Sequence, residues 1–395
     1  MGESILTWVE ATFSTILNIL LRGHYSVFYV IFALIFFSLP FLYFIIHKLD
    51  IHISLSFPET IRLRYLFFAH LILSLLILIP INAHGPPFDL SKYYFLANIP
   101  RDADILYRWI TGSAGTFAIR IEPLPYVFLL SLIWLGFPIC LLFLIPIMFS
   151  ALNLLLVYKL LETTFDEIMG FWGAFLYMFS PVILRIEVDL IRNMIGITFG
   201  LLIFYSWRKQ KLLTPLFMIL LMGTHLITAI PFFIAFIVLI VKEKDLLGFI
   251  FVGIVISIGI LVSLPFLLYI LFYYTILHPY FLPSQTLPNY IVSVLYEIYR
   301  IVAFVGILGV YFLCNHKKHD LHWDSYLVFC LVMVFAGFAF LSLHASRWGW
   351  LMVIPLIILV SKNLNLTDND RNRLFLFQII SYGLFACLLL IRTFI

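Results

Sequence analysis

The chain has 395 residues, of which 64% are hydrophobic and only 11% are charged, and its mean hydropathy is +1.10. Soluble domains carry about 25% charged residues, so this composition excludes a soluble globular protein and predicts a polytopic membrane protein. The formal net charge of +4 is small and lies mainly in short loops, which argues against nucleic acid as a partner.

The chain begins with apolar segments separated by a basic loop. Residues 4–21 place apolar side chains near one helical face, which predicts a helix in the membrane interface or a first span. Residues 25–46 predict the next span, and the basic loop 48–64 should be cytoplasmic by the positive-inside rule. Residues 65–81 then cross outward, so residues 82–122 form a long extracytoplasmic loop.

The block 123–161 is apolar throughout and is too long for one straight helix across a hydrocarbon core about 30 Å thick. Pro138 and Pro146 are predicted to break it into a surface or half-crossing piece followed by a span. The charges of the loops that follow require the whole block to make one net crossing.

The remaining spans are assigned from apolar runs and from the sides on which their loops must lie. The basic loops 208–211, 242–244 and 315–319 all fall on the cytoplasmic side under this assignment, which supports it. The predicted fold is therefore an all-α polytopic membrane protein, a single transmembrane domain over residues 1–395 with about twelve spans, or thirteen if the N-terminal helix inserts. The later spans are 168–184, 190–207, 212–222, 226–241, 246–274, 292–313, 326–343, 348–360 and 374–390.

The loop 82–122 combines carboxylates, basic residues and aromatic residues. Its paired turn formers predict short helices rather than one continuous helix. A loop of this length inside a compact fold is functional or disordered, and this one is too rich in aromatic and aliphatic residues to be disordered. The alternative is a solvated connector. Its acidic residues are Asp89, Asp102, Asp104 and Glu122.

Polar residues of the later segments gather at the same predicted outer end, where a polar turn is expected at residues 185–189. Charges near bilayer depth cost roughly 2.5–3.5 kcal/mol each on insertion scales and indicate function. Arginine binds phosphate bidentately, and a carboxylate accepts a proton or binds a divalent cation. An anionic lipid head group fits this set, which comprises Arg185, Glu187, Asp189, Arg192, His225, His278, His344 and Arg347.

Structural interpretations stay open for several of these positions. Arg347 could be an interfacial anchor beside two tryptophans, and His225 a helix-end histidine. Glu187 and Asp189 are two residues apart, so their side chains diverge by about 200° on a helix and converge only in a turn.

Several of these stretches resemble the GT-C superfamily, the polytopic glycosyltransferases that use polyprenyl-phosphate-linked sugars. Asp89, and the pair Asp102 and Asp104, resemble the acidic motif of that family's first outer loop. The segment 180–193 is similar to its second outer acidic turn, and His225 and Arg347 resemble later outer positions. The chain has no WWD-like motif and no large C-terminal soluble domain, which disfavours a protein oligosaccharyltransferase.

The resemblance implies sugar transfer from a polyprenyl-phosphate donor to a glycan, lipid or protein acceptor at the extracytoplasmic face of the cell membrane. Asp89 is the predicted base, with Asp102 and Asp104 as the second choice. Arg347, with Arg185 or Arg192, would stabilise the leaving phosphate. Glu187 and Asp189 would bind the sugar or a divalent cation such as Mg²⁺ or Mn²⁺, although the cofactor stays open.

Two alternatives belong to other functional classes. A secondary transporter or lipid flippase would show internal repeats and broken helices with polar residues at the bilayer midplane, and the sequence shows no convincing repeat. A non-catalytic scaffold could share the fold, because fold alone does not determine activity.

Overall fold

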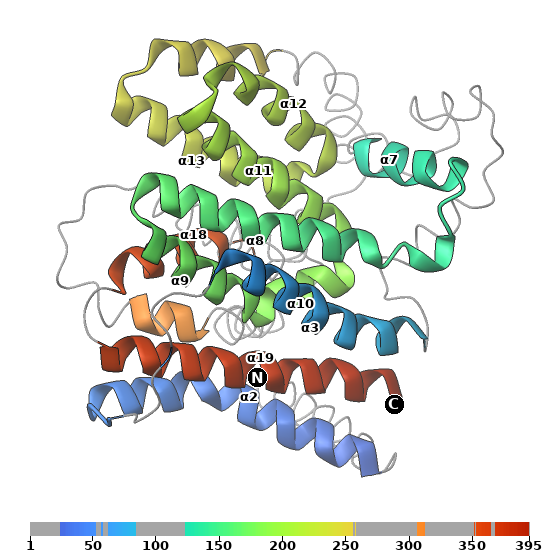
Figure 1. Ribbon diagram of the computed structural model, residues 1–395, viewed down its shortest axis with the longest axis vertical. Helices are drawn as coiled ribbons and strands as arrows, with labels where there is room; N and C mark the ends of the chain where they lie inside the picture. The colour runs from blue at the N-terminus through green and yellow to red at the C-terminus, as the bar shows by residue number, and fades with distance from the viewer. Residues whose placement is uncertain are drawn as a thin grey trace, which may run out of the picture.

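The computed structural model describes residues 24–52, 57, 62–83, 123–255, 257, 306–312, 351, 353–364 and 368–394. All regular structure within these residues is helical, and the helices pack side by side (Figure 1), which confirms the all-α prediction for this part of the chain. The elements are α2 His24–Lys48, α3 Leu63–Ala83, α7 Pro123–Trp134, η2 Ile139–Leu141, α8 Leu144–Thr164, α9 Glu167–Met178, α10 Pro181–Asp189, α11 Ile191–Lys209, η3 Lys211–Leu213, α12 Thr214–Thr224, α13 Leu226–Glu243, α18 Val353–Asn363 and α19 Asp368–Phe394.

Four described helical segments are long and apolar enough to cross a membrane, and a fifth is added if α9 and α10 form one bent span. The prediction of several membrane-crossing helices, as in an integral membrane protein, is confirmed at this level. The full set of about twelve spans stays a prediction, because several of them include residues outside the described ranges. The four segments are Val30–Lys48, Leu63–Ala83, Ile139–Thr164 and Asp368–Thr393.

One side of α3 is apolar and exposed although the helix belongs to the bundle. Phe68, Ile72, Leu76 and Ile79 recur every three or four residues along that side and are all more than half exposed. An apolar stripe of this kind is unfavourable in water and favourable against lipid. The exposed side of α3 therefore fits a helix at the lipid boundary.

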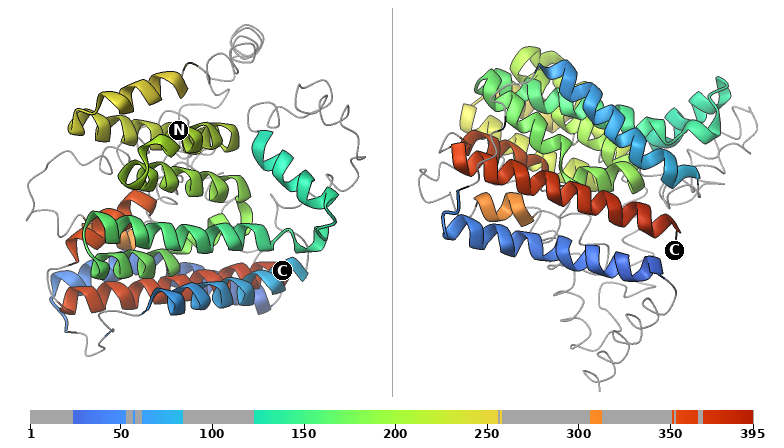
Figure 2. Two further views of the ribbon diagram at one scale, coloured as in Figure 1. Left: turned by 45° about the horizontal axis from the view of Figure 1, so that its top comes forward. Right: turned by 60° about the horizontal axis from the view of Figure 1, so that its bottom comes forward.

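The last described helix, α19, packs along the first, α2, and both views of Figure 2 place them next to each other. The rings of Phe36 and Phe385 lie 5.5 Å apart between them. At one end of this pair, the Arg373 guanidinium contacts Asp50 Oδ1 at 2.6 Å and Asp370 Oδ1 at 3.4 Å, and Nε donates to the Ile51 carbonyl at 2.7 Å. We call Arg373, Asp50 and Asp370 the Arg373 cluster.

The block 123–161 is broken as predicted, although by only one of its two prolines. Helix α7 ends at Trp134, Gly136 turns the chain with a φ of +93°, and Pro138 precedes the short helix η2. Pro146 lies in the first turn of α8 and does not break that helix. A proline is tolerated there because the first backbone N–H groups of a helix have no partner within it.

The segment between α9 and α11 differs from its prediction. Helix α10 continues through Asp189, and it is bent by 55° from α9 at a break after Met178. Ser180 caps the new helix, accepting a hydrogen bond from the Ile183 N–H at 3.4 Å, and Pro181 starts it. The prediction of a polar turn at residues 185–189 is therefore wrong: this segment is helical, and the chain breaks on either side of it.

Candidate functional site

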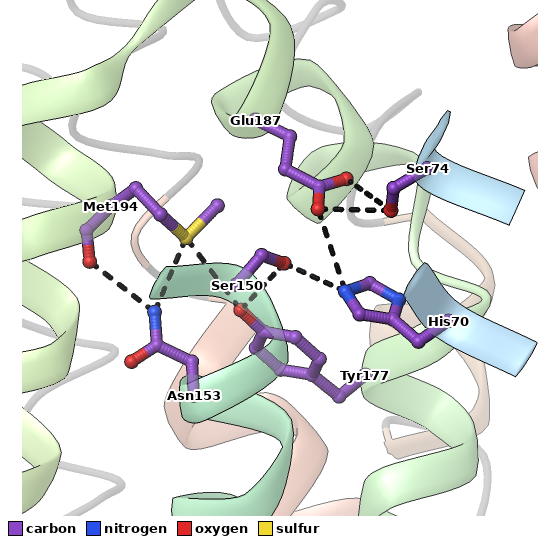
Figure 3. Close-up of polar contacts among 7 residues, drawn as sticks. All are labelled: His70, Ser74, Ser150, Asn153, Tyr177, Glu187 and Met194. Carbon is purple, nitrogen blue, oxygen red and sulfur yellow. Dashed lines mark hydrogen bonds and ion pairs between the residues drawn. The ribbon is translucent and has the colours of Figure 1, made fainter. Parts of the chain in front are cut away.

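Seven residues form a buried polar cluster where α3, α8, α9, α10 and α11 meet (Figure 3). Buried polar side chains are rare in apolar helices of a membrane protein and are expected to be functional. We call these residues the interior cluster, and they are His70, Ser74, Ser150, Asn153, Tyr177, Glu187 and Met194.

Two members of the interior cluster come from the same side of α3. His70 and Ser74 are four residues apart, so they lie on the same side of the helix, opposite the exposed apolar stripe. Leu66, Ile77 and Ile81 continue the buried stripe at the same spacing. Ser74 lies near the midpoint of α3, so the cluster lies away from both ends of that helix.

Glu187 is the carboxylate of the cluster and is only 1% exposed. Ser74 Oγ lies 3.0 Å from Oε1 and 3.2 Å from Oε2, and His70 Nε2 lies 3.4 Å from Oε1. An unpaired carboxylate in such surroundings would be very unfavourable. These contacts tie α10 to the middle of α3.

Ser150 extends the cluster from His70 towards α9. His70 Nε2 lies 2.9 Å from Ser150 Oγ, and Ser150 Oγ lies 3.4 Å from the Tyr177 hydroxyl. The Tyr177 hydroxyl in turn lies 3.7 Å from Met194 Sδ. Hydrogen-bonding groups from four helices thus form one connected path.

Asn153 and Thr198 fix the start of α11 against α8. Asn153 Nδ2 donates to the Met194 carbonyl and contacts Met194 Sδ, both at 3.2 Å, while Thr198 Oγ1 donates to the same carbonyl at 3.1 Å. The Asn153 amide thereby ties α8 to the first turns of α11, just after Leu190.

Three buried polar atoms in and beside the interior cluster have no hydrogen-bond partner among the described residues. They are His70 Nδ1, Asn153 Oδ1 and the Tyr382 hydroxyl. Buried polar atoms without partners are uncommon in native proteins, and each calls for an explanation such as a ligand, a proton or water.

A second feature concerns residues 84–122, between α3 and α7, which we call the acidic loop. The segments on both sides of it contact the helices. Asn82, near the end of α3, donates to the Cys140 carbonyl of η2 at 3.4 Å. Leu124, at the start of α7, lies so close to Gly223 of α12 that a Cβ there would be 2.7 Å from Leu124 Cδ1. Both segments that flank residues 84–122 are therefore held by specific contacts.

Gly223 is two residues from His225, which lies at the junction of α12 and α13, as predicted. His225 caps α13: its Nδ1 accepts from the Thr228 N–H at 3.2 Å and lies 2.7 Å from Thr228 Oγ1. The capping contacts agree with the helix-end interpretation of His225. The contact between Gly223 and Leu124 brings this junction near the start of α7.

The structure describes only some of the other predicted site residues. Asp89, Asp102, Asp104 and Arg347 lie outside the described residues, as does the side chain of Asp189. Arg185 and Arg192 are half-buried on α10 and α11, and each has an interaction of its own.

Metal binding is not indicated by the part of the chain that the structure describes. No group of three or more His, Cys, Asp or Glu side chains there could hold a metal ion. Because the side chain of Asp189 is outside that part, the prediction of a cation at Glu187 and Asp189 stays a prediction.

Sequence reasoning missed His70, Ser74, Ser150 and Tyr177. A signal was present, because a histidine and a serine four residues apart interrupt an otherwise apolar helix in α3. Comparison with family models, with curated proteins and with solved structures gave no match. The resemblance to the GT-C superfamily is therefore still a prediction.

Proposed function

We propose that this protein is a membrane glycosyltransferase that moves a sugar from a polyprenyl-phosphate carrier to an acceptor at the extracytoplasmic face. The observation that carries the proposal is the attachment of the acidic loop. Asn82, just before the loop, donates to η2. Leu124, just after the loop, packs against Gly223 of α12, two residues before His225. Such anchoring favours a loop held over the helices rather than a free solvated connector.

The chemistry assigned to the loop needs a base and a stabilised leaving group. Asp89, with Asp102 and Asp104 as the second choice, would accept the proton of the acceptor hydroxyl as it attacks the anomeric carbon. The lipid phosphate leaves, and Arg347 with Arg185 or Arg192 would offset its charge. Asp189 and His225 are the remaining polar groups for the sugar or a cation.

Glu187 has no role in this proposed site. Its carboxylate is 1% exposed and is already engaged by Ser74 and His70 near the middle of α3. A donor head group at the membrane surface would have to displace both contacts to reach it.

The test is sugar transfer from a polyprenyl-phosphate donor by the full chain in membranes, measured together with donor binding. Asp89→Asn should reduce the rate by about 10²–10⁴-fold with little change in donor affinity, because it removes a general base. Glu162→Gln removes a carboxylate next to Lys159 at the end of α8 and serves as the matched control. Near-normal turnover in Asp89→Asn, Asp102→Asn and Asp104→Asn would refute the proposal.

A secondary transporter or lipid flippase is the second candidate function. It is favoured by the breaks before and after α10 and by the ionisable pair His70 and Glu187 deep in the bundle. Proteoliposomes separate the two functions: a transporter moves intact lipid-linked sugar across the bilayer, whereas a transferase yields the glycosylated acceptor and free carrier.

A further inference from the structure

His70 and Glu187 are an ionisable pair that the proposed sugar transfer does not use. They come from α3 and α10, each is 1% exposed, and Nε2 lies 3.4 Å from Oε1. The pair is separated from both ends of the bundle, because Ser74 beside it lies near the midpoint of α3. The neighbouring groups decide which charges these two buried side chains can carry.

The surroundings of the pair supply hydroxyl groups rather than charge. Ser74 of α3 and Ser150 of α8 contact it directly, and Tyr177 of α9 and Tyr382 of α19 interact electrostatically with Glu187. The nearest arginines along the chain, Arg185 and Arg192, are half-buried and have interactions of their own.

The pair can hold no proton, one proton or two, with a net charge of −1, 0 or +1. An uncompensated charge in an apolar interior is very unfavourable, so the state with one proton is preferred.

The unpartnered nitrogen of His70 indicates where that proton lies. A charged imidazole would carry an N–H at Nδ1, which is buried and has no partner among the described residues. A neutral imidazole with its hydrogen on Nε2 donates to Ser150 Oγ at 2.9 Å and leaves only a lone pair at Nδ1. Glu187 then holds the proton as a carboxylic acid beside Ser74.

We propose that His70 and Glu187 form an intramembrane proton-binding site that holds one proton and keeps α10 docked on α3. When the Glu187 O–H bond breaks and the proton passes to a base in solution, the carboxylate left behind has one serine hydroxyl and one imidazole N–H within reach. Helix α10 has a break on each side, after Met178 and at Leu190, so it can move as a unit to bring the carboxylate to water.

The first test is infrared spectroscopy of the full chain in lipid nanodiscs at neutral pH. The wild type should show the C=O band of a protonated carboxylic acid, and the band should shift when glutamate is labelled with ¹³C. It should be absent from Glu187→Gln and present in the control Glu162→Gln. The labelled wild type makes this test independent of how well the variant folds, and a spectrum without a labelled acid band would overturn the proposal.

The second test is the pH dependence of folding. At alkaline pH a glutamate and a histidine of an unfolded chain bind no proton, whereas the proposed folded pair binds one. The folding equilibrium of the wild type should therefore fall by about tenfold per pH unit as the pH rises through this range. Glu187→Gln should lose that dependence and Glu162→Gln should keep it. Equal slopes in all three would refute the site.

The third test addresses the link to α10. Hydrogen-exchange protection factors for residues 181–189 should fall in the wild type over the pH range in which the acid band disappears. They should stay constant in Glu187→Gln, which resembles the protonated acid. Unchanged protection in the wild type after loss of the band would overturn the coupling, and all three tests are independent of sugar transfer.

Discussion

The interior cluster and the Arg373 cluster contain similar groups in opposite surroundings. Each joins acidic and basic side chains. His70 of α3 meets Glu187 of α10 inside the bundle, and Arg373 of α19 meets Asp370 of the same helix and Asp50, just after α2, at one end. Both partners are 1% exposed in the interior, whereas the side chain of Asp50 is 87% exposed. The interior pair must limit its net charge, whereas Arg373, itself 1% exposed, is paired with a carboxylate that water reaches.

The end of the bundle illustrates what water permits. The guanidinium of Arg373 donates a hydrogen bond to Asp50 and lowers the pKa of that carboxyl below its ordinary value. The ammonium of Lys211, the first residue of η3, likewise donates to Asp245 and lowers the pKa of that carboxyl. Asp50 is exposed and Asp245 is partly exposed, so water still reaches both carboxylates and the desolvation cost of these pairs is small.

Placing a positive charge in the interior cluster should have the largest effect. Glu187→Lys would place an ammonium beside His70 with no carboxylate to pair with it, and breaking a buried pair costs about 3–5 kcal/mol. We expect little folded protein by size-exclusion chromatography in detergent. Glu162→Lys makes the same change at a partly exposed position and should cost about 1 kcal/mol or less. Equal yields of the two variants would show that the interior cluster tolerates charge.

Removing the guanidinium at the end of the bundle should have an intermediate effect. Arg373→Gln loses the hydrogen bonds to the Ile51 carbonyl and to two carboxylates, and the Arg373 side chain is buried. A loss of about 1–3 kcal/mol is expected, because hydrogen bonds to charged groups are worth about that much. The measurement is the thermal midpoint in detergent. Arg208→Gln removes a guanidinium that is 43% exposed and should change the midpoint much less.

The smallest effect on stability is expected from Asp50→Asn. The way in which this effect changes with pH tests the Asp50–Arg373 interaction. Because the pKa of Asp50 is lowered on folding, its stabilising contribution is present above the unfolded value of about 3.9 and is lost as the pH falls through the folded value. The wild type should have a slightly higher midpoint than Asp50→Asn at pH 7, and the difference should shrink at acidic pH. A difference that grew with acid would contradict the Asp50–Arg373 interaction.

The sequence determined the boundaries of the simplest helices. The predicted spans 25–46 and 65–81 agree within two residues with α2 His24–Lys48 and α3 Leu63–Ala83. An uninterrupted apolar run that matches the bilayer fixes its own length, because every backbone polar group must be satisfied within the helix. The break before α8 was likewise visible, since proline and glycine act locally on the chain.

The interior cluster could not be predicted in the same way. The sequence placed Glu187 in an exposed turn because three charged residues lie close together at 185–189, and local polarity was interpreted as exposure. Its partner Ser74 is 113 residues away, and His70 is on the same helix as Ser74. Only the packing of α10 against α3 turns a polar segment into a buried one, because hydrogen bonds from a distant helix replace those that water would have given.

Composition and apolar run length by themselves determined that this chain is a helical membrane protein and where several of its helices begin and end. Those properties depend on short stretches of chain and on the thickness of the bilayer. The tertiary structure decided which polar residues are buried and which are solvated, as Glu187 and Asp50 show. The charge that each can carry depends on neighbours brought together by folding, and no local pattern contains that information.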